Sequence, residues 1–158
     1  MMLPFSHRID LENEDATIAC AKRLALLVQA GDVLALVGTL GMGKSVFARA
    51  FIRACMSDSE EVPSPTFTLV QIYDGHRFSL WHFDLYRLQN ADEAIELGVE
   101  EAFSEGVSLI EWPDRLGSFL PETRLEIAFS AADSPIARRL TLSGHGAWAD
   151  RLQEWTRI

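Results

Sequence analysis

The chain has 158 residues, about the length of one domain and enough to bury a substantial core. Its 23 acidic residues outnumber its 14 basic ones, for a formal net charge of −9, which argues against a surface built mainly to neutralise nucleic-acid phosphates but leaves room for a local basic patch. We find no internal repeat, low-complexity tract or linker, and therefore expect one domain over residues 1–158.

The cysteines, histidines and first residues indicate no disulfide, metal cluster or leader segment. Cys20 and Cys55 fall in segments with a helical pattern and lack C-x-x-C spacing, which is typical of buried thiols in a reducing cytosol. The four histidines are scattered, and MMLPFSHRID lacks a basic segment followed by a long apolar one. No apolar run approaches the ~20 residues that span a membrane. We expect a cytoplasmic protein with no membrane partner.

The first expected elements are a helix, a short strand and a second helix. Asn13 can cap a helix whose apolar residues, including Val28, recur at helical spacing, and Gly31 can terminate it. The all-apolar run Val33 to Val37 predicts a strand covered on both faces. After a glycine-rich stretch, SVFARAFIRACM predicts the second helix. Its apolar face would hold Val46, Phe47, Ala50, Phe51 and Ala54.

The second half of the chain predicts a hairpin, short helices and further strands. Residues 68–87 have two β-rich halves around Asp74-Gly75, a dipeptide favoured in tight turns. NADEAIELGVEEAFSEG predicts one or two short helices broken near Gly98, and VSLIEW a strand ended by Pro113. RLEIAF and RRLTLS predict a late hairpin, and WADRLQEW a closing helix. These elements favour an α/β fold with a central mixed sheet flanked by helices.

The stretch GTLGMGKS matches G-x-x-x-x-G-K-[ST] between the first strand and the second helix, which predicts a P-loop NTPase. Glycines let successive backbone N–H groups point inward at a phosphate chain, and the start of the helix adds its positive dipole end. Lys44 can reach the β- and γ-phosphates, and the Ser45 hydroxyl can ligate the magnesium ion that bridges them. The residues expected to contact ATP here are Gly38, Thr39, Leu40, Gly41, Met42, Gly43, Lys44, Ser45 and Val46.

Two carboxylates follow apolar runs, where a phosphate site needs an acid for its metal. Asp84 ends LWHF, and Glu111 ends VSLI. A strand-end acid commonly faces water, but beside a phosphate cradle one of these can hold Mg²⁺ while the other positions or deprotonates the attacking water. The sequence does not say which does which.

Four segments together resemble a known family: GTLGMGKS, SPTFTLVQIY, HFDLYRL and LIEWPDR, in this order and at these separations. They are similar to the bacterial ATPase of tRNA threonylcarbamoyladenosine biosynthesis, TsaE, over roughly residues 14–139. The glycine loop alone indicates only a P-loop protein, whereas HFDLYR and IEWP are more specific. The resemblance implies a small ATPase that uses ATP and Mg²⁺. It also implies partner proteins that transfer a threonylcarbamoyl group to an adenosine beside the anticodon, so that tRNA is reached indirectly, through that complex.

Roles for individual residues follow from this resemblance. It implies that Lys44 is the phosphate-binding and catalytic lysine and that Ser45 supplies the magnesium hydroxyl. Asp84 and Glu111 become the magnesium-site and catalytic carboxylates. Thr66, in the SPTF segment, matches a switch-like loop near the nucleotide, the alternative being a proline-stiffened connection.

The chain also departs from the family pattern or leaves it open at four positions. Trp112 matches a tryptophan beside the family's acidic residue, and it can equally be a core residue. The family's loop commonly reads G-D-L-G-A-G-K-T, where this chain has Thr39, Met42 and Ser45. These changes remove an acid near the phosphates and add bulk to the loop, while serine keeps the hydroxyl that the metal requires.

Three other functions compete with this interpretation. A small GTPase reads guanine with Asn-Lys-x-Asp, but neither asparagine, Asn13 or Asn90, is followed by lysine. A small-molecule kinase needs an acceptor pocket and an arginine-bearing lid, to which Arg87 and Arg115 are conceivable contributors. A nucleotide-gated binding module would need the phosphate cradle without a well-placed water.

Overall fold

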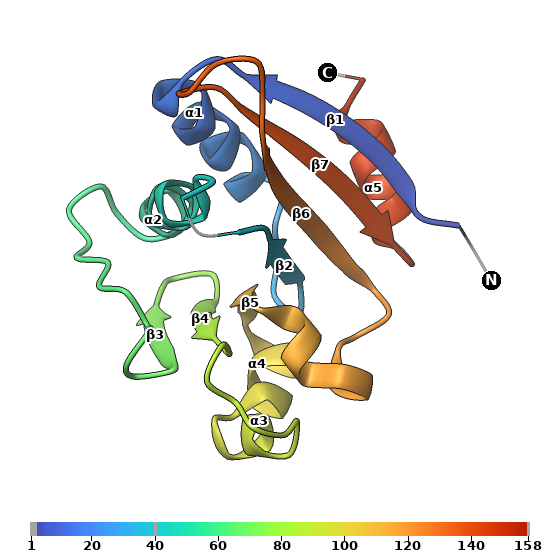
Figure 1. The fold of residues 1–158 in the computed structure, drawn as a ribbon. Coiled ribbons are helices and arrows are strands. Elements are labelled where there is room, and N and C mark those ends of the chain that lie inside the picture. The colour runs from blue at the N-terminus through green and yellow to red at the C-terminus, as the bar shows by residue number, and fades with distance from the viewer. Residues whose placement is uncertain (1–2, 40, 158) are drawn as a thin grey trace.

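The computed structural model describes residues 3–39 and 41–157, which form a seven-stranded mixed sheet flanked by helices (Figure 1). The strands are β1 (Phe5–Leu11), β2 (Val33–Val37), β3 (Val70–Asp74), β4 (Ser79–Asp84), β5 (Val107–Glu111), β6 (Arg124–Ala131) and β7 (Arg138–His145). The helices are α1 (Glu14–Ala25), α2 (Lys44–Cys55), α3 (Glu93–Glu96), α4 (Val99–Glu105), α5 (Trp148–Trp155) and the 3-10 helix η1 (Pro113–Phe119). The expected α/β class is confirmed.

The centre of the sheet is parallel and its edges are antiparallel. The spatial order is β1-β7-β6-β2-β5-β4-β3. β2 lies between β5 and β6 and runs parallel to both, and β4 runs parallel to β5. Because parallel strands end at the same edge of a sheet, the carboxyl ends of β2, β4 and β5 come together. Ligand sites of α/β sheets lie at such an edge.

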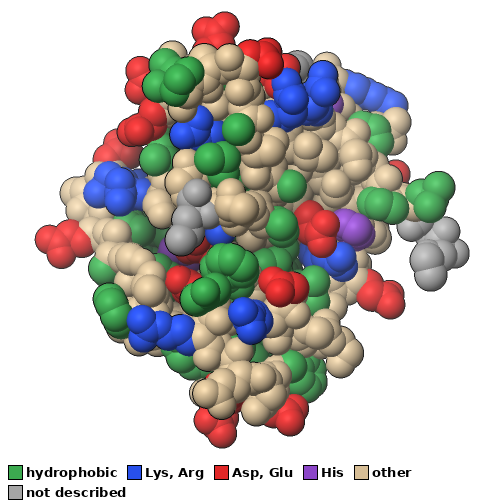
Figure 2. Space-filling view, in the orientation of Figure 1, with side chains coloured by type: hydrophobic (Ala, Val, Ile, Leu, Met, Phe, Trp, Pro, Cys, Tyr) green, Lys and Arg blue, Asp and Glu red, His purple; other side chains and the backbone are tan. Residues whose placement is uncertain are grey.

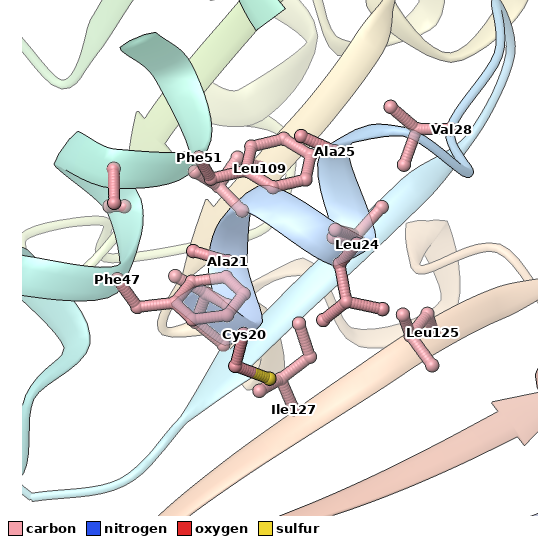
Figure 3. Packing of buried hydrophobic residues seen from close by; sticks show 14 of the residues in the cluster. Cys20, Ala21, Leu24, Ala25, Val28, Phe47, Phe51, Leu109, Leu125 and Ile127 are labelled. Atoms are coloured by element: carbon pink, nitrogen blue, oxygen red, sulfur yellow. The ribbon is translucent and has the colours of Figure 1, made fainter. Parts of the chain in front are cut away.

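Hydrophobic side chains fill the layer between the sheet and the pair of helices α1 and α2. Leu24, Phe47 and Phe51 from the helices pack with Leu125 and Ile127 from β6 (Figure 3). Complete burial of one such side chain contributes about 1.5–3 kcal/mol, so this layer holds α2 firmly against the sheet. A second cluster joins the sheet to the remaining short helices. It contains Val33, Trp81, Phe83, Leu85, Leu88, Ala94, Val99, Ala102, Ile110 and Leu116.

The two strands that carry the candidate acids turn alternate residues toward α2. Side chains alternate across a strand, so His82 and Asp84 share the face of Leu80, which belongs to the cluster beneath α1 and α2. On β5, Glu111 likewise shares the face of Leu109. The alternation therefore directs three polar side chains to the same side of the sheet as the start of α2.

Most expected elements are confirmed, and the errors have physical causes. The first helix is capped by Asn13 but ends at Ala25 rather than Gly31, because residues 27–32 form a turn in which Asp32 accepts the Gln29 N–H. Val28 is still buried, although from that turn. Ala54 lies on the exposed side of α2. β1 and η1 were not anticipated from the sequence.

The cysteines lie in helices as expected, and both are free thiols. Burial raises the pKa of Cys20 to about 11 and that of Cys55 to about 12. Both thiols therefore stay protonated at neutral pH, which makes them poor nucleophiles and poor metal ligands. In the described part of the chain, no helix combines the length and apolar character that crossing a bilayer requires.

Candidate functional site

The glycine loop joins β2 to α2 through backbone that other residues rarely adopt. Gly38, Gly41 and Gly43 have φ angles of +146°, +81° and +100°. A Cβ added to Gly38 would lie 2.8 Å from the carbonyl oxygen of Phe129 in β6. The loop thus takes its shape from glycine and from close packing on β6. Leu40, expected to contact nucleotide, lies outside the described residues.

We expect Gly38→Ala to distort this loop and lower stability by about 1–3 kcal/mol, because the new Cβ meets backbone and the φ angle disfavours L side chains. Thermal unfolding followed by circular dichroism measures the effect. Gly117→Ala is a useful comparison, since Gly117 has a positive φ but no atom within 4 Å of an added Cβ. Equal melting temperatures for the two variants would mean that the contact with Phe129 does not matter.

A cavity of about 530 Å³ opens beside the loop and the first turn of α2. This is within the volume range of small-molecule sites. One wall contains Gly41, Gly43, Lys44, Ser45, Val46 and Glu111. The other contains Asn13, Glu14 and Thr17 from the start of α1, Pro135 and Ile136 from the β6–β7 turn, and Arg138, the first residue of β7. The start of α1 and the β6–β7 turn lie side by side in Figure 1.

The two candidate carboxylates are neighbours in the sheet. Asp84 and Glu111 are register partners at the ends of β4 and β5. Asp84 is 8% exposed, and it accepts hydrogen bonds from the Thr66 hydroxyl at 3.3 Å and the Tyr86 N–H at 3.1 Å. Glu111 lines the cavity with Lys44, whereas Asp84 does not line it. The structure thus brings Thr66, from the expected switch segment, to one of the two acids.

His82 is a site neighbour that sequence reasoning did not single out. Its Nε2 lies 2.8 Å from Glu111 Oε2, and the imidazole is 3% exposed. Its Nδ1 has no hydrogen-bond partner among the described residues. The signal was present in HFDLYR, because His82 lies two residues before Asp84 and so faces the same way from β4.

Trp112 lies directly against the lysine of the loop. The Lys44 Nζ is 4.8 Å from the centre of the Trp112 ring, and the centres of the Trp112 and Tyr86 rings are also 4.8 Å apart. Lys44 itself is only 5% exposed, so the indole contacts a cation that is largely removed from water. Trp112 also has φ +59° and ψ +52°, a left-handed conformation that costs an L residue about 1–2 kcal/mol. Trp112 is half-buried and combines core packing with a position in the site.

Oxygen donors around the loop suit a hard cation. Mg²⁺ is bound by hydroxyl, carboxylate, water and phosphate oxygens, and it is usually held by one or two carboxylates. Ser45 and Glu111 line the same cavity, and Asp84 adjoins Glu111. Within residues 3–39 and 41–157, no group of three or more His, Cys, Asp and Glu forms a self-sufficient metal cage. The donor set therefore fits a magnesium ion that takes its remaining ligands from outside the protein.

Comparison with known proteins identifies the family. The model of the family described as "Threonylcarbamoyl adenosine biosynthesis protein TsaE" matches residues 11–140. The chain belongs to the TsaE family. A TsaE of Rickettsia felis is 35% identical over 145 residues, which cover 90% of this chain and 85% of that protein. A TsaE of Bacillus subtilis is 37% identical over 135 residues, covering 85% of this chain and 83% of that protein. The crystal structure of Bacillus subtilis YdiB matches with a TM-score of 0.82 and 29% identity, covering 99% of this chain and 98% of that one.

Two residues of the glycine loop that differ from the common TsaE pattern, Thr39 and Met42, differ from each other in exposure. Thr39 is exposed, whereas Met42 is half-buried and packs against the large core cluster. The side chain of Met42 thus adds its bulk to the core side of the loop. Arg138 and the start of α1, both on the cavity, were not anticipated, since they approach the TsaE loop from distant parts of the chain.

The two arginines considered for a kinase lid each lie over an aromatic ring. The Arg87 guanidinium carbon is 4.8 Å from the centre of the Phe67 ring, and that of Arg115 is 5.7 Å from the Tyr86 ring. Neither lines the main cavity. Phe67 itself is 81% exposed, so this group presents an apolar ring and a cation to solvent.

Proposed function

We propose that this TsaE-family chain binds and hydrolyses MgATP and so supports the threonylcarbamoyl modification of the adenosine beside the tRNA anticodon. The observation that carries the proposal is the single cavity that Lys44, Ser45 and Glu111 share, with Asp84 next to Glu111 in the sheet. Membership of the TsaE family supports the role in tRNA modification, and the cavity supports a reaction of bound phosphates.

In this proposal each side chain has a task that its position supports. The N–H groups of residues 38–39 and 41–46 surround the phosphates, and the Lys44 ammonium neutralises charge on the β- and γ-phosphates. Ser45 and one carboxylate would hold Mg²⁺, which when bound neutralises charge on the phosphate oxygens. The other carboxylate orients the attacking water and accepts its proton. Asp84 and Glu111 divide these two tasks.

Thr66 and Trp112 complete the proposed site. The hydrogen bond from Thr66 to Asp84 links the SPTF segment to the carboxylate next to Glu111, as a switch loop requires. Trp112 packs on Lys44 and limits the directions in which the ammonium can move. Through Thr66, the state of the nucleotide can alter the surface that Phe67 exposes.

The chemistry on tRNA belongs to partner proteins in this proposal. Asp and Glu side chains are spread around the face in Figure 2, with Lys and Arg in separate groups between them. With a net charge of −9, the chain is poorly suited to hold tRNA by itself. The threonylcarbamoyl-transferring proteins are the expected contacts, and they would associate with the ATP-bound chain.

We expect slow ATP hydrolysis by the isolated chain and faster hydrolysis with the threonylcarbamoyl-transferring proteins. A cation that stabilises the transferred phosphate is often supplied in trans and can raise the rate about 10³–10⁵-fold. Phosphate release measured for the chain alone, with tRNA alone and with the proteins tests this. Full activity alone, stimulation by bare tRNA but not by the proteins, or a phosphorylated metabolite product would contradict the proposal.

A further inference from the structure

Arg138 connects the β6–β7 turn to the glycine loop. Its Nη1 donates to the carbonyl oxygens of Pro135 and Ala137, both at 2.8 Å, and its Nη2 donates to that of Gly41 at 3.2 Å. The first two bonds fix the guanidinium within its own turn. The third reaches 97 positions back along the chain to the middle of the loop.

The third bond ends on the peptide group between Gly41 and Met42. Gly41 has φ +81°, a conformation that glycine adopts readily, and an added Cβ would meet nothing within 4 Å. A peptide is planar and trans, so its C=O and N–H point in opposite directions. By holding the Gly41 carbonyl, Arg138 also fixes the direction of the Met42 N–H in the same peptide plane. A phosphate cradle requires such fixed N–H directions.

The guanidinium of Arg138 forms no ion pair with an Asp or Glu among residues 3–39 and 41–157. Its neighbour Arg139 differs, since the Arg139 Nε donates to Asp10 at 2.9 Å. Arg138 lines the cavity together with Lys44, so its positive charge adds to the field that an anionic ligand would meet.

We propose that Arg138 is a positioning residue for the phosphate cradle, which locks the Gly41–Met42 peptide in the orientation that binds phosphate. The inference rests on the proposed ATP site and adds a residue from the β6–β7 hairpin to it. Its role is to preorganise the backbone, not to recognise the base.

The test compares ATP with tripolyphosphate, a probe that has phosphates but no base or ribose. Calorimetry gives the affinity of both for the unmodified chain, Arg138→Ala, Arg138→Lys and the matched control Arg139→Ala. We expect Arg138→Ala to weaken both ligands by about tenfold, because each uses the same N–H groups. Arg138→Lys should recover only part of the affinity, since an ammonium cannot bridge the turn and the loop as a planar guanidinium does. Arg139→Ala should change neither affinity.

Each contrary result overturns a definite part of the inference. Unchanged affinities in Arg138→Ala would show that phosphate binding does not depend on the hydrogen bond from Arg138 to Gly41. Loss of ATP affinity with tripolyphosphate unchanged would mean that Arg138 contacts the base or ribose. An equal loss of affinity in Arg139→Ala would mean that the loss in Arg138→Ala comes only from the change in net charge. An unmodified chain that binds neither ligand would overturn the proposed function itself, whereas the other results leave it standing. Melting temperatures check folding, and the lysine variant carries the comparison if the alanine variant fails to fold.

Discussion

Replacing Lys44 with alanine should weaken MgATP binding by about ten- to a hundredfold, the value of one or more hydrogen bonds to a charged group. The ammonium is buried against Trp112 and lines the cavity, so few solvent molecules compete for it. In that setting a cation interacts more strongly with phosphate than it would at an exposed surface.

Calorimetric titration of ATP measures this loss, with circular dichroism to show that the variant is folded. The chain offers a matched control in Lys22, its one other lysine, which is exposed on α1. Lys22→Ala removes the same charge from the molecule without touching the cavity, so its ATP affinity should stay unchanged. If Lys44→Ala is folded and binds ATP as tightly as the unmodified chain, the phosphates do not bind at this loop.

The amide variants Asp84→Asn and Glu111→Gln should lose hydrolysis by about 10²–10⁴-fold, with a smaller loss of ATP affinity, because a well-placed proton acceptor or metal ligand acts mainly on the reaction. The amides nearly preserve shape. Asparagine keeps an oxygen that can accept the Tyr86 N–H, and glutamine keeps one for His82. The acid whose amide raises the Mg²⁺ concentration needed for ATP binding is the metal ligand.

Asp74→Asn is the matched control for these two variants. Asp74 also ends a strand, but β3 runs antiparallel to β4. Asp74 therefore lies opposite Ser79, at the start of β4, whereas Asp84 is at its end. Single-turnover phosphate release should be the same for Asp74→Asn and the unmodified chain. An amide variant of Asp84 or Glu111 that also hydrolyses ATP at the unmodified rate has no part in the reaction.

Local patterns predicted the elements of this fold because short-range physics determines them. The Asn13 cap and the break at Gly98 each act within a few residues. The hairpin expected around Asp74-Gly75 also forms, although Asp74 pairs with Ser79 and the chain turns through residues 75–78 rather than in a tight two-residue turn. β1 was missed because its alternating FSHRIDL forms an edge strand, and its partner, β7, is more than 120 residues away. No local pattern records such a pairing.

The site was predicted in its parts but not in its contacts. A motif names Lys44 and Ser45, and the strand ends suggest Asp84 and Glu111. The contacts of His82 with Glu111 and of Arg138 with Gly41 depend on which strands are neighbours and on the path of a turn. Strand order is a long-range property, so these residues became visible only in three dimensions.

The packing of Gly38 on Phe129 has a consequence for synthesis of the chain. A ribosome adds about 5–20 residues per second, so the glycine loop exists several seconds before β6 does. Until β6 inserts beside β2, no Phe129 backbone supports Gly38, and the loop lacks the neighbour that shapes it. Nascent chains that end before β6 should therefore fail to retain nucleotide. A ligand that binds only the folded chain would stabilise the folded state by mass action. Nucleotide capture would then mark the moment at which translation has delivered β6 to the sheet.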